Sequence, residues 1–106
     1  MRRVVVTGLG IVSSIGNNAA EVTDSLRHGR SGIVAADDYR EMGFRSHIHG
    51  ATKIDLADHV DRKLLRFMGD GAAYNYIAME QAIADAGLAA DEVSHPRSGL
   101  VMGSGG

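Results

Sequence analysis

The stretch from residue 4 to residue 16 restricts most strongly how this chain can fold. Val4, Val5 and Val6 form a continuous β-branched run, which is typical of a strand that is buried on both faces. Gly8 and Gly10 follow, and glycines allow a tight turn or a close approach by another segment. We therefore expect an α/β protein, because a strand of this kind needs layers of structure above and below it.

The same stretch comes close to the dinucleotide fingerprint G-x-G-x-x-G, which supplies an alternative interpretation. Ser13 stands where the third glycine of that fingerprint allows close helix–strand packing. The first good helix cap is Asn18, so no helix begins where the phosphates would lie. A small Rossmann-like nucleotide-binding module is therefore the weaker hypothesis.

Local signals predict two helical regions. Asn18 as N-cap, with Glu21 three residues later, begins a helix over residues 18–29, in which Val22 and Leu26 share one face. Residues 55–88 form the second region, a core helix packed on a sheet. Its apolar stripe is Leu65, Met68, Ala72, Tyr76, Met79, Ile83 and Ala86. Gly69 and Gly71 each cost a helix about 1 kcal/mol relative to alanine, so we expect a kink or change of helix over residues 68–71, and Gly87 as the stop.

The remaining segments are expected to form loops and strands. Residues 31–43 and 89–97 are expected to be loops, and residues 98–102 a second buried strand. Alternation over residues 44–53 predicts a strand or hairpin arm with His47 and His49 on one face. Zinc takes three or four ligands and no second pair is present, so these histidines are better explained as polar residues on the solvent side of the strand.

Composition excludes several classes of function. The net charge of −2 argues against a nucleic-acid binder, and the absence of cysteine excludes disulfides and thiolate metal sites. No stretch approaches the ~18 apolar residues of a membrane span. We expect a cytoplasmic protein that binds neither nucleic acid nor a membrane.

Several stretches spread through the chain carry a family signature. They are Val-Val-Val-Thr-Gly-Leu-Gly-Ile-Val-Ser-Ser-Ile-Gly-Asn at 4–17, Ser-Leu-Arg at 25–27, Gly-Arg-Ser-Gly-Ile at 29–33, Arg-Ser-His at 45–47, Asp-Arg-Lys at 61–63, Arg-Phe-Met at 66–68, Ala-Met-Glu-Gln-Ala-Ile-Ala-Asp-Ala-Gly-Leu at 78–88, and Gly-Ser-Gly-Gly at 103–106. In this order they resemble the N-terminus of the β-ketoacyl-acyl carrier protein synthases, the condensing enzymes of fatty-acid synthesis. The type I branch is the most similar, because Ser-Ser-Ile-Gly replaces the Ser-Pro-Val-Gly usual in type II members.

The resemblance implies a fold and an activity. Family members are several times longer, so residues 1–106 correspond to an incomplete N-terminal part of a β-ketoacyl synthase N-terminal domain. Their fold is a thiolase-like αβαβα layered body, and this chain would be its N-terminal βαβ portion. The parent would be a homodimeric acyltransferase that elongates fatty acyl chains by decarboxylative Claisen condensation of acyl and malonyl-acyl carrier protein, without a metal or other cofactor.

The resemblance assigns no catalytic residue to this chain. The family's cysteine, two histidines and lysine would lie beyond Gly106, so the 106 residues alone are expected to be inactive. The residues themselves agree, since no cysteine and no G-x-S-x-G elbow is present. Gly106 is expected to line the acyl pocket or the dimer edge.

One cluster has an expected binding role. Arg62, Lys63 and Arg66 are three cations within five residues, and the last two share a helix face at i, i+3. By themselves they fit a solvated helix start, whereas the resemblance implies docking of the acidic acyl carrier protein. A non-catalytic carrier-protein-binding module is the remaining alternative.

Overall fold

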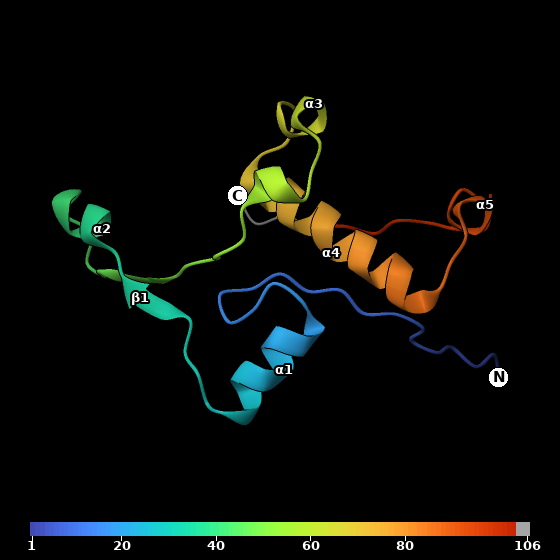
Figure 1. Ribbon diagram of the computed structural model, residues 1–106, viewed down its shortest axis with the longest axis horizontal. Coiled ribbons are helices and arrows are strands. Elements are labelled where there is room, and N and C mark those ends of the chain that lie inside the picture. Colours follow the sequence, from blue (N-terminus) through green and yellow to red (C-terminus); the bar gives the residue numbers. More distant parts are fainter. Residues whose placement is uncertain (104–106) are drawn as a thin grey trace. The chain divides into compact units, whose positions relative to one another are not determined.

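The computed structural model describes residues 1–103, with five α-helices, two strands and one 3₁₀ turn assigned in this range (Figure 1). In chain order they are α1 Ala19–Arg27, β1 Ile33–Ala35, α2 Asp37–Glu41, β2 Ile48–Gly50, the 3₁₀ turn η1 Leu56–Asp58, α3 Arg62–Leu65, α4 Asp70–Ala86 and α5 Ala90–Val93. The chain divides into two compact units. One is Ile11–Asp55, and the other joins Met1–Gly10 to the part that begins at Leu56.

Helix α1 begins as its sequence predicts. The Asn18 side chain accepts a hydrogen bond from the Glu21 amide at 3.0 Å, which satisfies one of the free amides of the first turn. The Glu21 carboxylate accepts in return from the amide of Asn17, at 2.7 Å. The reciprocal capping interaction therefore forms one residue earlier than in a standard capping box.

The buried face of α1 differs from the prediction. Val22 and Ser25 are buried, whereas Leu26 is exposed. Ser25 donates a hydrogen bond from its hydroxyl to the carbonyl of Ile15 at 2.6 Å. This bond removes the usual penalty for burying a hydroxyl, so the helix can turn a serine inward in place of the leucine.

The segment after α1 contains a short hairpin where a loop was expected over residues 31–43. Strands β1 and β2 pair antiparallel, with Val34 opposite His49, and α2 lies between them in the chain. The alternation over residues 44–53 correctly predicts a hairpin arm, but only Ile48–Gly50 forms ladder bonds. The residues that favour turns are the same in a loop and in the connection of a hairpin. The sequence therefore did not reveal the first arm of the hairpin, β1.

The two histidines of this hairpin are less exposed than expected. His47 and His49 are half-buried, while Ile48 between them is exposed. The ring of His49 meets the edge of the Tyr39 ring at a centroid distance of 5.3 Å. The prediction of a solvent-facing pair was therefore wrong. The aromatic contact accounts for the burial of His49, and within residues 1–103 no group of three or more His, Asp or Glu side chains is placed to hold a metal.

The long helical region breaks where its glycines predict. Helix α3 ends at Leu65 and α4 begins at Asp70, with Gly69 as its N-cap residue. At the other end Gly87 adopts the left-handed conformation, with φ of 68°, and the amide of Leu88 donates to the carbonyl of Ile83 at 3.2 Å. This is the Schellman arrangement expected at a glycine stop.

Helix α4 is apolar on more than one side, and the glycine-rich N-terminal segment covers one of them. Gly8 and Gly10 lie so close to α4 that an added β-carbon would overlap the backbone of Ala82 and Ala78 respectively. The amide of the intervening Leu9 donates to the Asp85 carboxylate at 2.9 Å. The two glycines therefore serve close packing on a helix, one of the two uses expected for them.

The apolar stripe predicted for α4 exists, but it does not form the core. The most buried residues of this unit are Val60, Ala73 and Ile77. Met68 and Tyr76, both of the predicted stripe, instead line an open hollow. Periodicity identified the apolar residues of the helix but not the side that this chain covers.

The two buried strands expected at the ends are not formed within the described residues. Val4 and Val6 are 92% and 89% exposed, and Val101 is 97% exposed. A strand is held by ladder hydrogen bonds to a neighbour, and the only sheet in residues 1–103 is the β1–β2 pair.

The loop expected over residues 89–97 contains one helical turn, α5 Ala90–Val93. No helix in residues 1–103 is long and apolar enough to cross a bilayer.

The close approach of Gly10 to α4 can be tested with Gly10→Ala. We expect a loss of about 1–3 kcal/mol, because the new methyl group would force the segment away from the helix. The midpoint of helix loss in urea, followed by far-ultraviolet circular dichroism, measures the change. Gly71→Ala is the matched control, since nothing lies near its added β-carbon, and it should stabilise α4 slightly. Equal midpoints for wild type and Gly10→Ala would contradict the packing described here.

The exposed end segments predict how the isolated 106-residue chain behaves. With Val4, Val6 and Val101 in water, we expect strong binding of an apolar dye and concentration-dependent association. Fluorescence with anilinonaphthalene sulfonate and sedimentation velocity measure both. A monomer that melts sharply and reversibly, without dye binding, would contradict this expectation.

Candidate functional site

The three cations singled out in the sequence lie on α3 and on the residue that follows it. Asp61 caps this single turn, and its carboxylate accepts from the Lys63 amide at 2.7 Å. The amide of Arg66 donates to the carbonyl of Arg62 at 3.3 Å, so Arg66 continues the helical turn. The local backbone therefore holds Arg62, Lys63 and Arg66 within one hydrogen-bonded turn.

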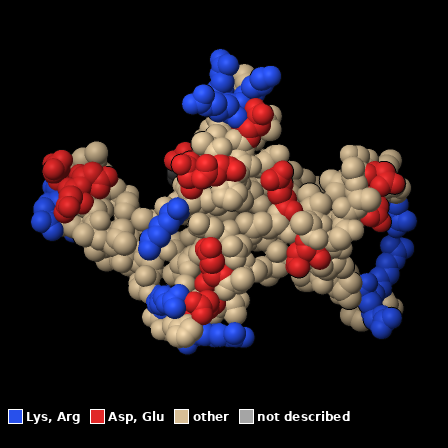
Figure 2. Space-filling model, viewed as in Figure 1, with Lys and Arg blue, Asp and Glu red and all other residues tan. Residues whose placement is uncertain are grey.

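These cations are exposed to solvent, and within residues 1–103 none of them forms an ion pair. All three residues are exposed, and Figure 2 shows Lys and Arg side chains gathered over α3. Among the described residues the ion pairs are those of Asp24, with His28 at 3.1 Å and Arg30 at 2.6 Å. Positive charge that is not neutralised within the protein is available to attract an anionic partner.

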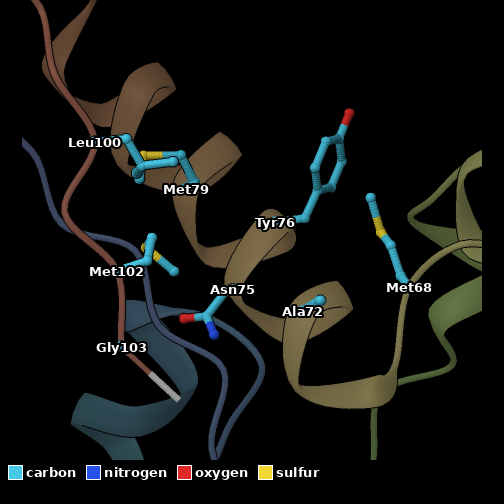
Figure 3. A pocket seen from close by; sticks show the side chains of 8 residues that line it. All are labelled: Met68, Ala72, Asn75, Tyr76, Met79, Leu100, Met102 and Gly103. Carbon is cyan, nitrogen blue, oxygen red and sulfur yellow. The ribbon is translucent and has the colours of Figure 1, made fainter.

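A second candidate is an open apolar hollow of about 500 Å³ between α4 and the C-terminal described segment. Figure 3 shows the side chains of Met68 and Tyr76 at the right and those of Met79, Leu100 and Met102 at the left. The remaining lining residues are Ala72, Asn75 and Gly103. Its thioethers and aliphatic groups can hold an apolar group, but they supply neither a nucleophile nor a base.

The polar group at this hollow is tied to its own helix. Glu80 lies one turn after Tyr76 and raises the pKa of the tyrosine hydroxyl, mainly through a side-chain hydrogen bond that favours the protonated phenol and further through its charge. A phenol held protonated at neutral pH can donate a hydrogen bond but cannot act as a general base. The hollow is therefore a binding or packing surface.

A third hollow, of about 330 Å³, lies beside the start of α1 and is polar. Ser13, Ser14 and Ser31 line it together with the paired Asp24 and Arg30. No histidine lines it, and the two carboxylates that do are held by other groups: Glu21 accepts from the Asn17 amide and Asp24 pairs with Arg30. It offers hydrogen-bonding groups without an arrangement for nucleophilic catalysis.

The other site prediction falls on a residue that the structure does not describe. Gly106, expected to line an acyl pocket or a dimer edge, lies outside residues 1–103. The sequence contains no cysteine, and no histidine lines either of the two hollows described above. The chain therefore carries a candidate docking surface and no candidate catalytic centre in its described part.

Sequence reasoning missed two features of this unit. The hollow was missed because a stripe of apolar residues looks the same in the sequence whether the chain covers it or leaves it open. The second feature is the exposure of Leu64 and Phe67, each of which directly follows a cation in the sequence and was not singled out there. The local sequence could have predicted their exposure. Both residues lie in a short segment that also contains Arg62, Lys63 and Arg66, and a segment with this much charge is not buried on all sides.

Comparison of the sequence with known proteins identifies the family of this chain. The sequence profile described as "Beta-ketoacyl synthase, N-terminal domain" matches residues 1–106. The chain is 55% identical over 105 residues to a 3-oxoacyl-[acyl-carrier-protein] synthase 1 of Haemophilus influenzae, covering 99% of this chain and 26% of that protein. It is 54% identical over 107 residues to the synthase 1 of Escherichia coli strain K12, covering 100% of this chain and 26% of that protein.

A more distant relative separates the two branches. A 3-oxoacyl-[acyl-carrier-protein] synthase 2 of Vibrio harveyi is 35% identical over 105 residues, covering 98% of this chain and 25% of that protein. The chain thus spans about a quarter of the length of the curated relatives it matches. Because the family profile covers its whole length, and the resemblance read from its motifs is thereby confirmed, the chain belongs to the β-ketoacyl synthase family and carries sequence of that family's N-terminal domain.

Proposed function

We propose that this chain is the N-terminal portion of a type I 3-oxoacyl-acyl carrier protein synthase. Its higher identity to two synthases named 1 than to the synthase named 2 supports the type I branch. The complete enzyme joins an acyl group to malonyl-acyl carrier protein by decarboxylative Claisen condensation, and so elongates fatty acyl chains. The role of residues 62–66 is to dock the carrier protein that brings the substrates.

The observation that carries this proposal is the unpaired positive charge of α3. Arg62, Lys63 and Arg66 are exposed on one capped turn, in a chain whose net charge is −2. Local charge of this kind raises the rate at which an acidic partner finds its site. The partner is an acyl carrier protein, which the names of the relatives give as the substrate carrier of those enzymes.

The chemistry of condensation belongs to residues that this chain does not contain. An acyl group is held during such a reaction on a nucleophile, and the 106 residues include no cysteine. The proposed enzyme therefore places its nucleophile and bases outside these 106 residues, and of this chain only Gly106 is at the acyl pocket or the dimer edge. The chain alone is inactive under this proposal, and no metal or redox cofactor is required.

The fold of the complete enzyme in this proposal is the thiolase-like αβαβα body. Two features of the chain support a layered surrounding: α4 is apolar on more than one side, and residues 4–6 and 98–102 have the composition of buried strands. We propose a homodimer in the cytoplasm, and the absence of cysteine fits a reducing compartment.

The nucleotide-binding alternative loses its main support. In a dinucleotide site the glycines allow the backbone to approach a pyrophosphate at a helix N-terminus. Here Gly8 and Gly10 approach the middle and end of α4, at Ala78 and Ala82. The space that glycine provides is thus filled by a helix of the same unit.

The docking role predicts the effect of reversing two charges in the complete enzyme. Lys63→Glu together with Arg66→Glu should slow reaction with carrier-bound substrates and make the remaining rate less sensitive to salt, because screening acts over about 10 Å at 0.1 M. Each exposed contact contributes only about 0.2–1 kcal/mol, so the double variant is the proper test. Steady-state kinetics over a series of salt concentrations measure the effect.

This experiment has two controls, one that changes the substrate and one that changes other charged residues of the protein. Short thioester mimics that lack the carrier protein should react at the wild-type rate in the double variant. Arg40→Glu with Arg97→Glu introduces the same change of charge at two exposed positions away from α3, and it should leave the carrier-dependent rate nearly unchanged. Equal loss with both kinds of substrate would point to damaged folding and contradict the docking role.

A further inference from the structure

The charged turn also presents apolar surface. Phe67 is 87% exposed and Leu64 is 44% exposed, and the two are spaced i, i+3, so they stand close together on a helical turn. Arg66 and Lys63 each directly precede one of them in the chain. An exposed phenylalanine that directly follows a cation differs from an ordinary solvated helix start, which carries charge alone.

The backbone holds this apolar pair in place. The amide of Phe67 donates to the carbonyl of Leu64 at 3.0 Å, and the amide of Met68 donates to that of Leu65 at 3.1 Å. Leu65 and Met68 form the other apolar pair of the turn and are half-buried. The turn therefore covers one pair within its own unit and leaves the second pair outside.

We propose that Phe67, together with Leu64, is the apolar anchor of the docking surface, inserted into an apolar patch on an acidic carrier protein. This inference rests on the proposed function. It adds an apolar contact that holds the carrier protein after the positive charges have attracted it. Aromatic side chains dominate the binding energy of many interfaces, and surrounding charges act mainly on the association rate. The partner is an acidic protein because Arg62, Lys63 and Arg66 form the rim of the same surface.

The two kinds of contact respond differently to salt, which allows them to be separated. Removing a rim cation weakens the salt dependence of binding, because one screened attraction is lost. Removing an apolar anchor lowers affinity at every salt concentration and leaves the slope with salt unchanged. Phe67 is therefore predicted to act on the dissociation rate and Lys63 on the association rate.

The test is binding of purified, unacylated acyl carrier protein to the complete enzyme at several salt concentrations, followed by surface plasmon resonance. Phe67→Ala should weaken binding about tenfold through faster dissociation, which is more than most interface residues cost when truncated to alanine. Phe67→Tyr keeps the ring and should restore most of the affinity. Lys63→Ala should lower the association rate and flatten the salt dependence. Phe44→Ala is the matched control, because Phe44 is also exposed but lies outside this turn.

Three results would overturn the proposal. Phe67→Ala could bind the carrier protein with wild-type rates, which would mean that the ring contacts nothing there. It could lower the melting temperature by several degrees or dissociate the enzyme's subunits, which would mean that the enzyme itself covers Phe67. Absence of carrier-protein binding by the wild type would refute the proposed function as well, and so is distinguishable from the first two results.

Discussion

The apolar surface of α4, which extends over more than one face, is the constraint on which the larger unit depends. On one face the chain approaches so closely that only glycine fits at Gly8 and Gly10, and the Leu9 amide is fixed to the Asp85 carboxylate. On another face Tyr76 and Met79 line an open hollow together with Met68. A helix with apolar groups on more than one face is typical of a position between layers. One of these faces is largely uncovered by the described residues.

The same helix explains the form of the proposed docking surface. Helix α4 cannot extend backwards through Gly69 without losing stability, so the chain turns, and α3 forms as a separate capped turn. This break leaves Leu65 and Met68 half-buried while Phe67 and the cations stay in solvent. A glycine signal that ends one helix thereby presents a mixed basic and apolar surface of the kind that protein partners bind.

Local signals were predictable from the sequence, and features that need partners were not. The Asn18 cap and the Gly87 stop were correct because each is decided within a few residues. Residues 4–6 and 98–102 have strand composition, yet a strand needs a neighbour for its hydrogen bonds, and the described residues offer none. The cations were found from their spacing, whereas the exposure of Phe67 became visible only once the turn was placed.

The central claim is that this chain folds as part of a layered enzyme that completes its strands. Hydrogen–deuterium exchange of the amides of residues 4–6 and 98–102, compared between the 106-residue chain and the complete protein, tests it most directly. We expect fast exchange in the chain alone and strong protection in the complete protein, because only there would both segments have neighbouring strands on a covered sheet. Equally fast exchange in both proteins would contradict the account.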